Sequence, residues 1–418
     1  MDNLSHTLSG LVAGELLHRA LPAEPSEDRQ RRRHRLMLVS CALASSFPDL
    51  DIVLTPLLPE PLGYLLHHRG HTHTVLYAFP QALLLCALLW LLWPSARALL
   101  RESRAARLGL AAGMAVSFGL HLLMDYLNSY GVHPFHPIDS RWLYGDMVFI
   151  LEPVFWITLG VPLVVLLRRA WLRATLLGLL AALLAYFSAA GFLHWASLIA
   201  LYAGGLLLIV LQQPVAAAER AGRLRTPGGA RGILAGIALL AAFLAVQAVG
   251  ARAAARQIGA VLAQKDPDST LKDSARTAFP SNPLCWNFVS VESDEQAGHY
   301  RLRRGVLSIA PGLLPVSSCP AVLAERHLQR EIDPGFALLA EHTASLAELR
   351  RLQREDCFFE AWMRFARAPQ VEGRVASDKR FSGFGRGNFT TMDLDDFAGR
   401  DCPRHVPRWD FPRADLLE

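Results

Sequence analysis

The sequence predicts an α-helical polytopic membrane protein, with about eight helices of which the first two are short, followed by a soluble C-terminal α+β domain. Of its 418 residues, 52% are hydrophobic and only 19% are charged, which is too apolar for an ordinary soluble protein. The apolar residues are concentrated before about residue 250, whereas the later residues have the mixed composition of a soluble domain. We therefore expect a transmembrane domain over residues 1–250 and a second domain over residues 265–418.

Six apolar runs have, or nearly have, the length needed to cross a hydrocarbon core, which is about 20 residues in a helix. They cover residues 75–93, 108–127, 149–168, 174–191, 195–211 and 232–250. Two segments before them, 6–21 and 36–47, are shorter or less apolar. We interpret these two as short membrane helices packed inside the bundle, or as re-entrant pieces.

Arginine clusters between these runs predict the orientation of the chain. They lie at residues 29–35, 97–107, 168–173 and 220–231, and all fall on one side if the helices alternate. Because arginine-rich loops stay in the cytoplasm, the other connections and the C-terminal domain are expected to be extracytoplasmic. The N-terminal residues lack the basic start and cleavage site of a signal peptide. No basic stripe carries interleaved aromatic residues, so nucleic-acid binding is not expected.

The C-terminal domain is expected to contain both strands and helices. Residues 285–293 and 299–309 alternate in hydrophobicity as strands do. Residues 337–355 and 360–368 are predicted to be helical from their apolar periodicity. The tryptophans of these segments are expected in the core.

Cysteine usage agrees with an oxidising environment for this domain. Four of the six cysteines lie in it: Cys285, Cys319, Cys357 and Cys402. An even number of cysteines outside the cytoplasm favours two disulfides, with three possible pairings. Four reduced cysteines in a cytosolic domain are the alternative. Cys41 and Cys86 lie in apolar runs and are expected to be small buried residues.

Histidine and aspartate residues gather at one end of the first helices. The segment HHRGHTHT, residues 67–74, precedes an apolar run, and PDLD, residues 48–51, ends the second segment. His121 and Asp125 are four residues apart on an apolar helix, so their side chains project from the same face. Because ionisable groups in a membrane are costly, they usually mark a functional site.

These residues have the chemistry of a metal site. Asp49 and Asp51 follow a proline in extended or turn backbone. His68, His71 and His73 flank a glycine that allows a tight bend. Imidazole and carboxylate ligands suit zinc, with iron or manganese as alternatives. We therefore expect a divalent metal, zinc in the first place, at the outer membrane face.

Each of these groups also has a structural interpretation. The whole set of histidines and aspartates would then be a polar packing network. Arg69 either pairs with a carboxylate or binds a phosphate. His133 and His136 lie beside prolines and are either loop residues or ligands. An interfacial position without metal is the expectation for His18, His34 and His194. Helix capping or pairing with Arg141 is the alternative for Asp139, Asp146 and Glu152.

Four motifs occur in a characteristic order: SHTLSG, PDLD, HRGHTHT and HLLMDYLNSYG. In this order, over roughly residues 1–160, the chain resembles the YdjM-type family of bacterial membrane-bound metal-dependent hydrolases. The resemblance implies a bacterial inner-membrane location. His71 falls on a variable position of the family pattern. The pattern selects His6, Asp49, Asp51, His68, Arg69, Thr72, His73, His121, Asp125 and Asn128.

The resemblance implies the roles of these residues. The metal ligands would be His6, Asp49, Asp51, His68, His73, His121 and Asp125. Asp51 would also act as general base or orient a histidine, and Arg69 would hold a substrate phosphate. A looser similarity to the zinc-dependent phospholipase C and nuclease fold favours a phosphoester substrate.

The expected function is therefore a metal-dependent hydrolase that acts on a membrane lipid or lipid-linked phosphoester through a metal-activated water. One alternative is a metal or solute transporter, which would place ionisable residues deep in several helices. The later helices are nearly devoid of charge. A second alternative is a non-catalytic membrane scaffold with a structural metal, which would have a closed coordination shell.

Overall fold

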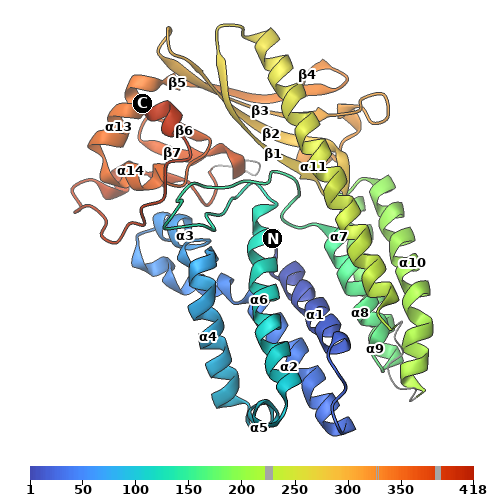
Figure 1. The fold of residues 1–418 in the computed structure, drawn as a ribbon. Coiled ribbons are helices and arrows are strands. Elements are labelled where there is room, and N and C mark those ends of the chain that lie inside the picture. The colour runs from blue at the N-terminus through green and yellow to red at the C-terminus, as the bar shows by residue number, and fades with distance from the viewer. Residues whose placement is uncertain (222–228, 326, 328, 382–386) are drawn as a thin grey trace. The chain divides into compact units, whose positions relative to one another are not determined.

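The computed structural model describes residues 1–221, 229–325, 327, 329–381 and 387–418 (Figure 1). Arg223 and Arg225 of the last predicted arginine cluster lie outside the described residues. The chain forms two compact units, each built from separate stretches of sequence. Unit 1 comprises Met1–Leu50, Thr72–Asp125 and Ile150–Ala245; unit 2 comprises Asp51–His71, Tyr126–Phe149 and Val246–Glu418.

Six helices in the described part of the chain are long and apolar enough to cross a membrane. They lie in Glu27–Leu57, Val75–Leu92, Arg104–Tyr126, Ala170–Ala189, Trp195–Arg220 and Arg231–Lys265. Together with α1 (Asn3–Ala20) and a shorter apolar segment at Pro153–Leu166, helices occupy every predicted segment. The chain is therefore an integral membrane protein, as its composition predicts.

The apolar run predicted at roughly 149–168 forms a shorter helical segment than its length suggested. The helical segment begins only at Pro153, where the Glu152 carboxylate accepts a hydrogen bond from the Val154 backbone at 3.2 Å. It comprises α7 (Pro153–Phe155), a π-helical stretch (Trp156–Gly160) and α8 (Val161–Leu166). The N-terminal cap and the proline after it explain the late start.

The arginine cluster at 29–35 does not form a loop, contrary to the prediction. It lies inside α2 (Glu27–Ser46), whose first turn Ser26 caps. Glu27 and Asp28 pair with arginines four residues later, at 3.2 and 2.6 Å. A capped start and pairs of this spacing stabilise a helix even in a strongly charged sequence.

Unit 1 packs around close helix contacts. Its other helices include α4 (Val75–Leu92), the short α5 (Pro94–Glu102), α6 (Arg104–Tyr126), α9 (Ala170–Ala189) and α10 (Trp195–Arg220). α1 and α2 approach so closely that a Cβ at Gly10 would meet the Cys41 carbonyl oxygen at 2.3 Å. At Gly14 it would meet the Met37 carbonyl oxygen at 2.5 Å. These two glycines therefore bring the N-terminal helix directly against α2.

Unit 2 is built on an antiparallel sheet of strand order β1-β2-β3-β5-β4 (Figure 1). Its strands are β1 (Thr270–Phe279), β2 (Asn282–Asp294), β3 (His299–Ser308), β4 (Arg330–Asp333) and β5 (Phe336–Ser345). Trp286 and Phe288 of β2 pack with the second half of α11 (Arg231–Lys265), whereas Val289 and Val291 pack with α13 (Leu346–Glu355) and α14 (Cys357–Met363). The alternation of strand side chains thus places helices on both faces of the sheet.

The smaller elements of unit 2 complete its outline. They are α3 (Leu62–His67), α12 (Ala321–Ala324), α15 (Ala414–Leu417), and a second sheet of β6 (Pro369–Glu372), β7 (Val375–Asp378) and β8 (Met392–Asp393). The prediction of a helix over 337–355 is wrong in its first half. Residues up to Ser345 belong to β5, because they pair with β3 and β4 in the middle of the larger sheet.

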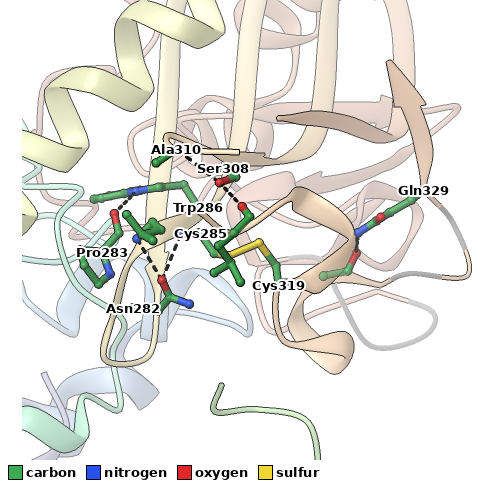
Figure 2. The surroundings of a disulfide bond; sticks show 11 residues. Asn282, Pro283, Cys285, Trp286, Ser308, Ala310, Cys319 and Gln329 are labelled. Carbon is green, nitrogen blue, oxygen red and sulfur yellow. Dashed lines mark hydrogen bonds between the residues drawn. A yellow bond between two sulfur atoms is a disulfide. The ribbon is translucent and has the colours of Figure 1, made fainter. Parts of the chain in front are cut away.

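Both predicted disulfides are present in unit 2. Cys285 is bonded to Cys319, which ties β2 to the segment after β3 (Figure 2). Cys357 is bonded to Cys402, which ties α14 to the C-terminal segment. The tryptophans of the predicted strand and helix, Trp286 and Trp362, are fully buried as expected.

Two connections from the N-terminal half of the chain pack within unit 2. The indole nitrogen of Trp409 donates to the Leu66 carbonyl oxygen at 3.1 Å. Arg367 donates to both carboxylate oxygens of Asp146 at 2.8 Å each. Arg380 donates to the Tyr130 carbonyl oxygen at 3.1 Å. Residues 51–71 and 126–149 are thereby attached to the C-terminal domain.

Candidate metal centre

Four predicted ligands meet in unit 1. Each of Asp49, His73, His121 and Asp125 offers one ligand atom, and these atoms all lie within 4.8 Å of one another. α6 supplies His121 and Asp125 from one face, as their spacing predicts. The side chains of His73, His121 and Asp125 are fully buried, and that of Asp49 is 12% exposed. The group is therefore able to hold a metal ion.

The candidate ligand atoms of these four residues lie close enough together to contact one metal ion. His73 Nε2 is 2.9 Å from His121 Nε2, 3.4 Å from Asp49 Oδ1 and 3.2 Å from Asp125 Oδ2. His121 Nε2 is 3.5 Å from Asp125 Oδ2 and 3.7 Å from Asp49 Oδ1. Two imidazole nitrogens and two carboxylates thus face one another in a buried volume, which suits a divalent cation.

The tautomer of His121 fits metal binding. Its Nδ1 lies 2.7 Å from the Ser45 carbonyl oxygen, which can only accept a hydrogen bond. The proton of the neutral ring is therefore on Nδ1, and Nε2 presents its lone pair to the group of four. Metal-bound histidines usually donate their other ring nitrogen to an oxygen in this way. The residues present therefore fit a zinc, iron or manganese ion.

His6 lies beside the group and contacts one of its members. Its Nε2 is 3.2 Å from Asp125 Oδ1, and its ring stacks on His121 with centroids 4.0 Å apart. The amino group of Met1 contacts the same Asp125 oxygen. The Ser45 hydroxyl donates to the His6 carbonyl oxygen at 2.7 Å. His6 is thus placed to orient the Asp125 carboxylate.

The remaining predicted site residues lie in unit 2. Asp51 Oδ1 is 3.0 Å from His68 Nδ1, and Asp51 Oδ2 accepts a hydrogen bond from the Arg69 backbone at 2.9 Å. Arg69 has a φ of 58°, a left-handed conformation that is strained for a residue with a side chain. The Asp51 carboxylate thus holds the HRG turn, which favours an orienting role for this residue.

The Arg69 side chain contacts two further residues, Asn128 and Tyr130. Its Nη1 donates to Asn128 Oδ1 at 3.1 Å, and its guanidinium lies 4.7 Å from the centre of the Tyr130 ring. The motif pattern had selected Asn128, but sequence reasoning missed Tyr130. Its position two residues after Asn128, in the same motif segment YLNSYG, was the signal available. Burial raises the pKa of Tyr130 well above its ordinary value, so its hydroxyl remains protonated.

The other histidines of the motifs lie in unit 2. His71, His133 and His136 contact the ring of Trp409, at centroid distances of 4.8, 3.8 and 4.7 Å. The ring contacts agree with the loop interpretation of His133 and His136. Thr72, which precedes His73, contacts the His73 Nδ1 at 3.0 Å.

Asp139, Asp146 and Glu152, for which helix capping or ion pairing was the alternative, form such contacts. Asp139 forms an ion pair with Arg141, whose hydrogen bonds lower the pKa of this carboxyl to about 2. Asp146 binds Arg367, and Glu152 caps α7. At the opposite end of α1, His34 contacts Glu15 at 2.5 Å and stacks on His18.

Comparisons with known proteins found similarity in the N-terminal part of the chain. Residues 1–196 match the family described as YdjM inner membrane protein. A Bacillus subtilis (strain 168) protein described as uncharacterized protein YfhP is 27% identical over 160 residues. That match covers 38% of this chain and 44% of the relative, so the chain spans less than half of the relative's length. No solved structure matches the chain. With its membrane helices and the ordered motifs of the centre, the N-terminal part of this protein, residues 1–196, is similar to the YdjM inner membrane protein family.

Proposed function

We propose that the protein is a metal-dependent hydrolase of phosphoesters. The observation that carries the proposal is the buried group of Asp49, His73, His121 and Asp125, in which the His121 lone pair faces two carboxylates. These four residues would hold the ion, and zinc is the first choice for such a ligand set. A divalent metal ion held there supplies a Lewis acid that makes water a nucleophile at neutral pH.

The chain's own residues have separate tasks in this proposal. The Ser45 carbonyl keeps the proton of His121 on Nδ1, which preserves the ligand tautomer. His6 holds the Asp125 carboxylate in place through its contact with Oδ1. Within unit 2, Asp51 orients His68 and the backbone of Arg69, and the Arg69 guanidinium would bind a phosphate group.

The proposed substrate is a membrane lipid or a lipid-linked phosphoester, and the proposed location of unit 2 is extracytoplasmic. Two observations support the location: the disulfides Cys285–Cys319 and Cys357–Cys402, and the arginine clusters of the sequence, which would all lie on the opposite side of the membrane. Disulfides persist in oxidising compartments, and arginine-rich connections stay inside. A substrate that partitions into lipid is proposed because the centre belongs to a unit whose helices are long and apolar enough to cross a membrane.

The decisive experiment measures metal and turnover on the same samples. The full chain would be purified in detergent, and bound metals would be measured by elemental mass spectrometry. Wild type would be compared with His121→Ala and Asp125→Asn, with His299→Ala in unit 2 as a matched control. We expect stoichiometric metal in wild type and in the control, and its loss in the two centre variants.

Each preparation would then be tested against soluble and lipid phosphoesters. Loss of hydrolysis together with the metal is the expected result. Wild type that binds no metal even after reconstitution would mean that the four residues form a polar packing network, and that the protein is a scaffold. Normal turnover by His121→Ala would also refute the proposal. Bound metal that crosses the membrane in liposomes, without hydrolysis of any phosphoester, would indicate a transporter.

A further inference from the structure

Two buried donors lie beside Arg69 in unit 2. The hydroxyl of Tyr130 and the side-chain amide nitrogen of Asn128 have no hydrogen-bond partner among the residues that the structure describes. Tyr130 is 6% exposed and Asn128 is 3% exposed. A buried donor without a partner costs roughly 1–3 kcal/mol. Both donors belong to residues that contact the Arg69 guanidinium, Asn128 through its amide oxygen and Tyr130 through its ring.

The orientation of the Asn128 amide follows from its surroundings. Its oxygen accepts hydrogen bonds from Arg69 Nη1 at 3.1 Å and from the Tyr130 backbone at 2.9 Å. Because both neighbours are donors, the atom facing them must be the oxygen, and the amide cannot be flipped. Asn128 Nδ2 therefore presents its hydrogens away from these contacts, as a donor to a ligand.

The position of the Arg69 guanidinium is fixed by several contacts. The guanidinium of Arg69 lies over the Tyr130 ring at 4.7 Å, and its backbone has the strained φ of 58°. The Asp51 carboxylate stabilises that conformation by accepting from the Arg69 backbone at 2.9 Å. Strained residues persist where the surrounding structure enforces them, and they cluster at functional sites. The strain therefore agrees with a requirement for one defined guanidinium position.

A cavity of about 820 Å³ lies one aromatic layer away. Tyr64 and Phe389 line it. The Tyr64 ring stacks on His68 at 4.9 Å, and the Phe389 ring lies 6.4 Å from that of Tyr130. A cavity of this volume has the size of small-molecule sites, which measure about 300–1,000 Å³. Its lining does not include Arg69, Asn128 or Tyr130, so it adjoins the rings beside these residues but not the residues themselves.

We propose that Arg69, Asn128 Nδ2 and the Tyr130 hydroxyl form a binding site for a phosphoryl group. A guanidinium supplies charge and paired donors to phosphate oxygens, and the two neutral donors match the remaining oxygens. The choice of a phosphoryl group over other anions rests on the proposed hydrolase function. The group bound is either a lipid headgroup or a free phosphate.

The test measures binding without turnover. Isothermal titration calorimetry on the full chain in detergent would use inorganic phosphate, dioctanoyl phosphatidic acid, and dioctanoylglycerol, which lacks the phosphoryl group. Tyr130→Phe removes only the hydroxyl, and Asn128→Asp keeps the accepting oxygen while replacing the amide donor. Tyr300→Phe is the matched control, because the Tyr300 hydroxyl is also buried without a partner among the described residues but lies in the apolar core of the sheet. Thermal unfolding would show that each variant is folded.

We expect Tyr130→Phe and Asn128→Asp to weaken binding about ten-fold or more, the equivalent of about 1.4 kcal/mol, and Tyr300→Phe to leave it unchanged. Binding of both phosphate and phosphatidic acid, but not of the glycerol lipid, assigns the phosphoryl group itself. Binding of phosphatidic acid alone assigns a lipid headgroup. Unchanged binding in both site variants, or no binding of either probe by wild type, overturns the proposal.

The same titration on His121→Ala separates this inference from the proposed function. The phosphoryl site is expected to bind in that variant as in wild type, because none of its residues belongs to the metal group. Loss of binding in His121→Ala would show that phosphate is held at the metal centre, and would overturn the inference. Retained binding in a protein that hydrolyses nothing would instead refute only the hydrolase function.

Discussion

Arg367 attaches the segment that carries Asn128 and Tyr130 to the C-terminal domain. It donates to both oxygens of Asp146 at 2.8 Å and to Asp273 at 2.6 and 3.1 Å. Its side chain is 5% exposed, that of Asp146 is 2% exposed and that of Asp273 is 20% exposed. One buried cation thus compensates two carboxylates that come from different parts of the sequence.

Replacing Arg367 with Met is expected to destabilise unit 2 strongly. Removal of one partner of a buried ion pair costs about 3–5 kcal/mol, because it leaves uncompensated buried charge. Arg276 lies 3.4 Å from Asp146, and Arg413 lies 3.2 Å from Asp273, so part of the charge stays compensated. We therefore expect a loss of about 3 kcal/mol in the free energy of unfolding, the low end of that range.

The pH dependence gives a second check with a defined sign. Burial acts to raise the pKa of Asp273, but Arg367 and Arg413 prevail and lower it below its ordinary value. A carboxyl with a lowered pKa stabilises the folded state above its unfolded pKa of about 3.9 and loses that contribution as the pH falls. The difference between wild type and Arg367→Met is therefore expected to be largest near neutral pH and to shrink in acid.

Denaturant unfolding in mild detergent, followed by tryptophan fluorescence, measures this difference. The control is Arg351→Met, which removes an arginine from exposed pairs with Glu348 and Glu355 and is expected to change little. The double variant Arg367→Met, Asp146→Asn should regain part of the lost stability, because it has one buried charge fewer. Unfolding of Arg367→Met at the wild-type denaturant concentration would refute the reasoning.

Three further predictions concern other parts of the molecule. Replacing Cys357 and Cys402 with Ser should lower the free energy of unfolding of unit 2 by roughly 2–4 kcal/mol, measured by denaturant unfolding; an unchanged midpoint would show that this disulfide constrains nothing. Gly10→Val should disrupt the α1–α2 contact and lower the melting temperature, whereas Gly119→Val, with nothing within 4 Å of its Cβ position, should not; equal melting temperatures for the two variants would contradict the close packing. His6→Ala should weaken metal binding less than His121→Ala does, measured by competition with a chelator, because His6 contacts a ligand and lies outside the group of four; equal losses would make His6 a ligand.

Much of the centre was predictable from local sequence. The four-residue spacing of His121 and Asp125 on an apolar helix gave their common face, and both join the group of four. The HRG turn was recognisable from its glycine and its neighbours. What could not be predicted was how the two aspartates of PDLD divide: Asp49 joins the histidines of unit 1, whereas both oxygens of Asp51 are engaged by the HRG turn. That division depends on where segments distant in sequence lie.

The sequence by itself determined which segments are membrane helices and that a disulfide-bonded α+β domain follows them. These properties depend on hydropathy, helix period and cysteine count, which are encoded in short stretches of chain. Only the tertiary structure decided the pairing of the four cysteines, the strand at Phe336–Ser345, and the partnership of Arg69 with Asn128 and Tyr130. The physical reason is that such pairings are contacts between residues far apart in sequence. They can be identified only when the path of the whole chain is known.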